Sequence, residues 1–250
     1  MHTTDTRAVL AVLALLAVPG CLPGQEEPET GWRGNADFGL TITQGNSETT
    51  NLAITGHSVH RMERQRVTLD GNFIRASAEG VRTANKAEGR ARYDFFPNDR
   101  FFVFARTGVG FDEPAGIDLR VSPGAGVGYT VLQGAAATLD TQLEGRWIRD
   151  SFEDGTTDQD LFVTASENFA WQITETTDLT QLFEYSPNSA DLSDFLLNGE
   201  VALSVLITSG LGLKVSVRDE YNSEPFVDAD TGVAREKNDL AFVTGLTVQF

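Results

Sequence analysis

The feature that most constrains this chain is an alternation of side-chain type with a period of two residues. Between residues 86 and 94 the odd positions are small or aromatic, and the even positions are all charged: Lys86, Glu88, Arg90, Arg92 and Asp94. Successive side chains point to opposite faces of a β-strand, so this segment would have one charged face and one apolar face. From Trp32 onward no segment keeps a helical period for long. The alternation therefore predicts an all-β protein.

The strand-like segments are longer than those of soluble β proteins. They run for about ten to fourteen residues, whereas membrane-spanning strands need about 9–11 and soluble strands most often have about 5–6. The connections also alternate between short and long, as they do in outer-membrane barrels. The short connections are Pro97–Asn98, Gln133–Gly134 and Ser209–Gly210, and the long ones cover residues 78–85, 150–158, 187–193 and 222–238.

The chain ends on a strand-like segment whose apolar residues lie two apart: Leu246, Val248 and Phe250. This ending resembles the signal that the outer-membrane barrel-assembly machinery recognises, although the edge strand of a soluble sandwich would give the same pattern. With the strand lengths and the loop alternation, it favours a closed antiparallel transmembrane β-barrel. An even strand number places both termini on the periplasmic side. We count twelve strands, and ten or fourteen also fit: 33–43, 49–60, 64–76, 85–96, 100–112, 117–131, 135–149, 159–171, 176–186, 194–207, 210–222 and 238–250.

In such a barrel the apolar face of each strand meets lipid and the polar face lines the lumen. The clearest lipid-facing residues are Phe38, Leu40, Ile42, Leu52, Ile54, Tyr93, Phe101, Val103, Leu139, Leu203, Leu213, Phe242 and Leu246. The candidate site is a ladder of lumen charges of both signs. It comprises Asp37, Asp70, Lys86, Glu88, Arg90, Arg92, Asp94, Arg106, Arg120, Asp140, Glu144, Arg146, Glu200, Lys214 and Arg218.

Two interpretations of this lumen stay open. Five glycines fall on its side of the predicted strands and would leave room for a narrow pore or a small binding cavity: Gly108, Gly110, Gly124, Gly126 and Gly128. The charges would instead form a salt-bridged plug that holds the wall together, because arginine pairs in a two-pronged manner with carboxylates. Twelve strands lie between the side-chain-filled barrels of eight strands and the wide channels of 16–18.

Composition excludes several other classes. Acidic residues outnumber basic ones 36 to 19, giving a net charge of −17, which argues against nucleic-acid binding. One cysteine and three histidines predict no disulfide framework, no metal site and no cofactor. His57 and His60 lie three apart and so fall on opposite strand faces. Ser58 between them raises the alternative of an outer-membrane hydrolase. No nucleophile context accompanies this pair, so we predict a non-enzymatic protein.

The first residues are predicted to be a targeting signal. Arg7 precedes an apolar run of eleven residues, 8–18, which is too short to span a membrane as a helix and is typical of a secretory signal peptide covering residues 1–21. Cys21 follows in a sequence that resembles a lipoprotein cleavage box. Acylation of Cys21 and ordinary cleavage nearby both stay open. Residues 22–31 are rich in proline and glutamate and predict a disordered tether, leaving residues 32–250 as the barrel.

Several short motifs, taken in order, resemble a known family. Trp32-Arg-Gly34 with Gly39 and Gly45-Asn-Ser47 comes first. Then follow Arg92-Tyr-Asp94, Phe101-Phe-Val-Phe104, Asp118-Leu-Arg120, Gly124-x-Gly126-x-Gly128-Tyr129, Tyr221-Asn-Ser-Glu-Pro225 and the segment from Asp239 to Phe250. Over about residues 31–250 the chain resembles the YdiY-like salt-induced outer membrane proteins. The resemblance implies a bacterial outer-membrane barrel of unknown biochemical role, loosely linked to osmotic conditions, and it supplies no catalytic residues.

We therefore expect a non-enzymatic outer-membrane barrel that is narrow and porin-like or purely structural. The alternatives are a lumen cavity that binds a small polar or charged ligand, an outer-membrane hydrolase that uses the His57 region, and a lipid-anchored soluble β-barrel. The expected partners are outer-membrane lipid, lipopolysaccharide and the barrel-assembly machinery.

Overall fold

The computed structural model describes residues 31–43, 49–78, 80–208, 210–225 and 237–249. This part of the chain folds into strands and one short 3-10 turn, η1 (Glu113–Ala115). The strands are β1 (Gly31–Thr43), β2 (Thr49–Met62), β3 (Gln65–Ala78), β4 (Val81–Phe95), β5 (Phe101–Asp112), β6 (Ile117–Val121), β7 (Gly124–Gln133), β8 (Ala137–Phe152), β9 (Thr157–Thr174), β10 (Thr177–Pro187), β11 (Phe195–Leu206), β12 (Leu211–Asn222) and β13 (Asn238–Gln249).

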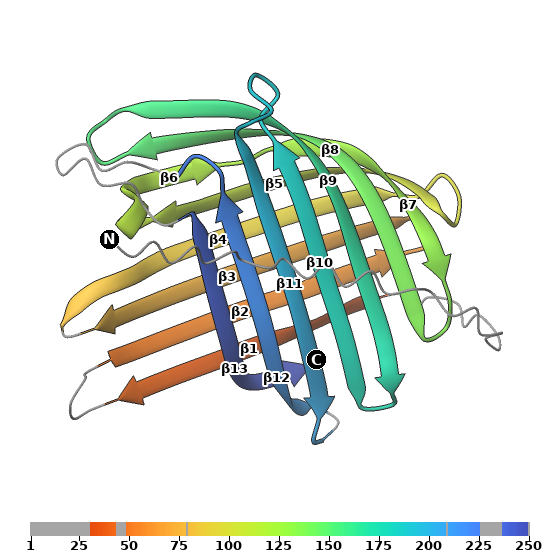
Figure 1. The fold of residues 1–250 in the computed structure, drawn as a ribbon. Coiled ribbons are helices and arrows are strands. Elements are labelled where there is room, and N and C mark those ends of the chain that lie inside the picture. Colours follow the sequence, from red (N-terminus) through yellow and green to blue (C-terminus); the bar gives the residue numbers. More distant parts are fainter. Residues whose placement is uncertain (1–30, 44–48, 79, 209, 226–236, 250) are drawn as a thin grey trace, which may run out of the picture.

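The strands form one closed antiparallel sheet (Figure 1). The ring closes where β1 pairs with β13, which sets Ala36 opposite Val248 and Phe38 opposite Leu246. Each described strand thus has a hydrogen-bonded neighbour on both sides, which a lipid environment requires because it offers the backbone no hydrogen-bonding partners. The prediction of a closed antiparallel barrel is confirmed.

The wall contains twelve strands, as predicted, because β6 and β7 are two pieces of one wall strand. Both pieces pair with β5 on one side and β8 on the other. The interruption falls at Ser122–Pro123, where proline has no N–H to give to the ladder. The junction is still held, since Ser122 N donates to Gly108 O at 2.9 Å and Trp147 N donates to Pro123 O at 3.0 Å.

The two ends of the barrel differ in their connections. The turn end carries the connections 63–64, 96–100, 134–136, 175–176 and 207–210, together with the start of β1 and the end of β13. The loop end carries the other connections, among them 113–116, 153–156, 188–194 and 223–237.

The prediction of a long loop at residues 78–85 is wrong. β4 begins at Val81, Ala78 pairs with Val81, and Gly80 adopts a φ of 75° in the turn between them. The predicted loop at 150–158 is also shortened to residues 153–156, because β8 and β9 extend into it. Polar residues made these segments resemble loops, but a ladder that continues beyond the apolar band tolerates polar side chains on both faces.

Burial in this barrel is the reverse of that in a soluble protein. Among the described residues only six apolar side chains are buried, against nine polar or charged ones, while thirty-four large apolar side chains are exposed. Phe38, Leu143 and Leu213 are each at least 50% exposed on the outer wall. An exposed apolar surface of this size needs a nonaqueous partner, and a lipid bilayer supplies it. No helix in the described ranges is long and apolar enough to span a membrane.

Aromatic residues mark the outer wall near both ends. Toward the loop end the rings of Tyr185, Phe195 and Tyr221 follow one another with centroids 5.7 Å apart. Toward the turn end Trp32 contacts His60 at 4.8 Å. Membrane barrels carry such aromatic girdles at the two lipid–water interfaces, so the apolar band lies between these groups.

Candidate functional site

A cavity of about 720 Å³ occupies the loop-end half of the lumen. Its lining contains eleven carboxylate side chains and six basic ones, so the walls are charged and the balance is acidic. Seven residues of the predicted charge ladder line it. They are Lys86, Glu88, Arg90, Arg120, Arg146, Glu200 and Arg218.

Cross-strand ion pairs organise much of this cavity. Arg218 lies directly opposite Glu200 on β11 and donates to its Oε2 from Nε at 2.9 Å and Nη2 at 2.6 Å. Arg120 lies opposite Asp150 on β8 and donates through two nitrogens. Directly opposed residues are near neighbours in a sheet, so register alone brings these charges together.

A second charged cluster lies at the floor of the cavity, around Arg106 of β5, and its Glu184 also lines the cavity. Its Nη2 lies 2.5 Å from Glu144 Oε2, and its Nη1 lies 3.5 Å from Glu184 Oε1. Glu144 and Glu184 are both buried. Glu184 also accepts a long hydrogen bond of 3.4 Å from Asn198 Nδ2. Carboxylates buried in this way need cationic partners, and Arg106 serves both.

The turn-end half of the lumen next to β3, β4 and β5 is packed with side chains. Asp94 is fully buried, and it pairs with Arg66 at 3.1 Å and with Arg92 at 2.7 Å. The Arg92 guanidinium lies 3.8 Å from the centre of the Phe104 ring, a cation–π contact. Phe102 is completely buried beside it.

Glycines of β7 make this packing fit. A Cβ built on Gly128 would lie 2.1 Å from Phe102 Cζ, and one on Gly126 would lie 2.7 Å from Phe104 Cζ. A Cβ on Gly124 would lie 2.0 Å from Glu144 Oε1. The room predicted at these three glycines is therefore taken by two phenylalanine rings and a carboxylate. At Gly108 it is taken by the Ser122 hydroxyl, and only Gly110 borders the cavity.

The remaining predicted lumen charges lie elsewhere on the inner wall. Lys214 Nζ donates to Asp37 Oδ2 at 2.7 Å, and Thr55 Oγ1 donates to the same oxygen at 2.9 Å. This network joins β1, β2 and β12 across the seam where the barrel closes. Asp140 accepts a hydrogen bond of 2.6 Å from Thr130 Oγ1 on β7.

The two histidines of β2 lie on opposite faces, as their spacing predicts. His57 Nδ1 lies 2.7 Å from Asp70 Oδ1 on the inner wall, whereas His60 contacts Trp32 outside. Ser58 shares the outer face with His60, so Ser58 and His57 are not brought together. No group of three or more metal-binding side chains is found among the described residues.

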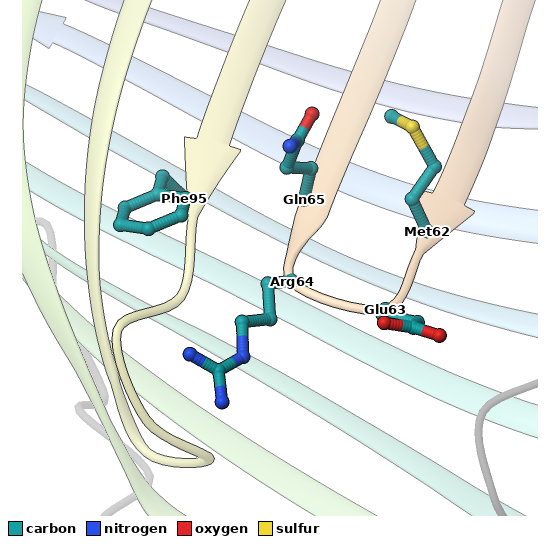
Figure 2. A pocket seen from close by; sticks show the side chains of 5 residues that line it. All are labelled: Met62, Glu63, Arg64, Gln65 and Phe95. Atoms are coloured by element: carbon teal, nitrogen blue, oxygen red, sulfur yellow. The ribbon is translucent and has the colours of Figure 1, made fainter.

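A second hollow lies at the turn end, around the β2–β3 turn (Figure 2). It has a volume of about 410 Å³ and is lined by Met62, Glu63, Arg64, Gln65 and Phe95. Phe95 is 38% exposed, and Figure 2 shows the side chains spread along the turn and three strands rather than gathered around one point. This hollow therefore lacks the converging polar groups of a ligand site.

Several residues that shape the lumen were not predicted from the sequence. Arg66 and Glu184 were not predicted because their strands show weaker alternation of charged with apolar residues. Phe102 and Phe104 were not predicted because the run Phe101-Phe-Val-Phe104 is apolar on both faces. A useful signal was present: two phenylalanines on the lumen side of one strand, followed by a run of alternating glycines.

Other predicted positions are placed only in part. Leu246 and Val248 lie on the outer face, 48% and 41% exposed. Phe250, Cys21, residues 22–30 of the predicted tether and the side chains of Leu40 and Ile42 lie outside the described residues, whereas Gly31 begins β1.

Comparison with known structures supports the fold. An outer membrane channel from Pseudomonas putida F1 superposes with a TM-score of 0.51, over 94% of this chain and 99% of that one. The sequence identity is 12%, so the likeness concerns the barrel architecture alone.

Comparison of sequences identifies the family. The uncharacterized protein YdiY of Escherichia coli (strain K12) is 27% identical over 197 residues, which cover 78% of this chain and 75% of that protein. The family model described as protein of unknown function, DUF481, matches residues 36–250. The resemblance drawn from the short motifs is thereby confirmed, and the chain belongs to the DUF481 family.

Proposed function

We propose that this protein is a narrow, porin-like channel of the bacterial outer membrane for small polar or charged solutes, without enzymatic activity. The observation that carries the proposal is a closed barrel that encloses a charged cavity of about 720 Å³ behind an apolar outer wall. A wall that is apolar outside and ionic inside has the polarity that a water-filled path across lipid requires.

Planar-bilayer recording with the purified mature chain tests this proposal. Single-channel conductance that increases with salt concentration is expected, together with liposome swelling by small sugars or amino acids. The absence of conductance and of swelling from a barrel with heat-modifiable gel mobility would contradict a channel function.

The second candidate is a closed lumen that holds a small ligand. Packing of Phe102, Phe104 and Asp94 in the turn-end half favours this candidate, because the cavity lining does not extend to those residues. It predicts saturable solute binding by a barrel that conducts no ions. A purely structural barrel would show neither property.

We propose that both termini face the periplasm and the loop end faces outward, toward lipopolysaccharide. Short periplasmic turns and longer external loops are typical of outer-membrane barrels. Cysteine substitutions at Asp154 and Asn98 test the orientation. A membrane-impermeant maleimide should label residue 154 but not residue 98 in intact cells, and the reverse pattern would overturn the orientation.

Three further expectations belong to the same proposal. The barrel-assembly machinery inserts the chain by recognising its last strand, residues 1–21 direct export, and expression increases with external salt. Acylation of Cys21 would be seen as incorporation of labelled palmitate that a Cys21→Ala variant loses. Release of the delipidated protein from membranes by alkali would instead indicate a lipid-anchored soluble barrel.

A further inference from the structure

The cavity floor contains an arginine without a carboxylate partner. Arg146 of β8 donates one hydrogen bond, from Nη2 to Ser186 Oγ at 3.1 Å, and its buried Nε has no hydrogen-bond partner among the described residues. It makes no ion pair with any acidic residue in the part of the chain that the structure describes. Glu184 and Glu144 attract Arg146 without forming an ion pair with it. Since a guanidinium has five N–H donors and a permanent charge, Arg146 keeps N–H donors that an anion can use.

A second arginine nearby is only weakly paired. Arg90 of β4 forms a long ion pair with Glu88, with Nε and Oε2 3.9 Å apart, and Asp70 lies opposite it on β3. Arg106, Arg120 and Arg218 in the same lumen each have a carboxylate oxygen within 2.6 Å. Arg90 and Arg146 therefore differ from the arginines that hold the wall together.

The glycines opposite these two arginines are covered by other side chains: Ser122 and Glu88 at Gly108, and Glu144 at Gly124. Arg90 pairs with Gly108 of β5, and Arg146 pairs with Gly124 of β7. Ser122 lies beside Gly108 and lines the same cavity as the two arginines. A small anionic group can thus reach the two arginines from the cavity itself, which both arginines and Ser122 line.

The walls above this floor are acidic. Asp160 lines the cavity on β9, two residues from Phe162, which pairs with Arg146. Two residues of a strand span about 7 Å, so Asp160 lies that far above the level of Arg146. Asn188 Nδ2 donates to both Asp160 and Asp194 at 2.8 Å, and this holds the two carboxylates together near the loop end. Neither carboxylate pairs with a basic side chain among the described residues.

We propose that the cavity binds a small zwitterion, with its carboxylate on Arg146 and Arg90 and its ammonium group toward Asp160 and Asp194. This proposal rests on the proposed function, because it names the solute class of the same lumen. A simple anion would be repelled by the excess of acidic residues above the floor, and a simple cation would be repelled by the arginines. A molecule carrying both charges a few ångströms apart satisfies both, and guanidinium pairs well with carboxylate.

Three probes of nearly equal size distinguish the charge classes: 4-aminobutyrate, butyrate and butylamine. Calorimetric titration of the purified mature barrel in detergent should show saturable binding of 4-aminobutyrate at least tenfold tighter than that of the other two. Equal binding of all three, or no binding of 4-aminobutyrate, would overturn the zwitterion site. Conductance measured without these solutes reports on the channel itself, so the two proposals fail separately.

Substitutions then test the residues. Arg146→Gln should weaken 4-aminobutyrate binding at least tenfold, and Arg146→Lys should recover part of it. Arg149→Gln, on the outer face of the same strand, should leave binding unchanged. Asp160→Asn should weaken binding of 4-aminobutyrate but not of butyrate. Heat-modifiable mobility verifies that each variant is folded, and unchanged binding by folded Arg146→Gln would assign the arginine a structural role only.

Discussion

The two halves of the lumen are built from similar residues, but one half is packed with side chains and the other contains a cavity. In the turn-end half, Asp94 is fully buried, and two arginines and two phenylalanine rings fill the space around it. In the loop-end half, Glu200 and Arg218 form an equally short pair beside a cavity of about 720 Å³. The difference lies in Gly126 and Gly128 of β7, which leave room for the rings of Phe104 and Phe102 from β5 in the turn-end half. Charges in the lumen thus do not by themselves indicate a pore.

The largest expected effect is in the packed half, at Asp94. Asp94→Ala would leave Arg66 and Arg92 without their shared buried carboxylate, and breaking a buried ion pair on one side costs about 3–5 kcal/mol. Urea unfolding followed by tryptophan fluorescence should show a loss of this size. A free energy of unfolding within about 1 kcal/mol of the wild type would mean that water reaches Asp94 and its two arginines.

A smaller effect is expected from adding one methyl group to the glycine row. In Gly128→Ala the new methyl group would overlap the Phe102 ring, and overpacking of this kind costs about 1–3 kcal/mol. Gly145→Ala on β8 is the matched control, because its Cβ would have no atom within 4 Å. Equal unfolding midpoints for the two variants would show that the Phe102 ring moves freely.

The cavity half should respond in selectivity rather than in stability. The Glu200–Arg218 pair is partly exposed, with 23% and 31% of the two side chains accessible, so Glu200→Gln should cost only about 1 kcal/mol. Removing one carboxylate from an acidic lining should lower the preference for cations, measured as the reversal potential across a salt gradient. An unchanged reversal potential would place the ion path away from Glu200.

The smallest effect is expected above the cavity, at the loop end. Hydrogen bonds from Asn85 and Arg82 lower the pKa of Glu113 below its usual value. A carboxylate with a lowered pKa in the folded state stabilises that state above its ordinary pKa, and the contribution is lost as pH falls through the lowered pKa. NMR titration should show Glu113 protonating at lower pH in the wild type than in Arg82→Gln. Identical titrations would mean that the contact does not persist in solution.

The period of two residues was sufficient to predict much of this molecule. It placed twelve wall strands with boundaries close to those observed, because each strand must alternate between lipid and lumen to be stable. It also assigned Phe38, Val103 and Leu213 to the outer wall. The alternation failed at residues 81–85, where the strand leaves the apolar band and lipid no longer selects the side chains.

The sequence by itself thus determined the wall: an antiparallel barrel of about twelve strands, with most of its charges assigned to the correct face. Only the tertiary structure decided how the interior is divided, since partners such as Arg106 and Glu184 are brought together by closure of the barrel and not by any local pattern. Alternation reflects the contact of each strand with lipid on one face and with the lumen on the other. The filling of the lumen depends instead on side chains that reach across several strands. For that reason Arg92 lies packed against Phe104, while Arg146, with the same charge, remains beside an open cavity.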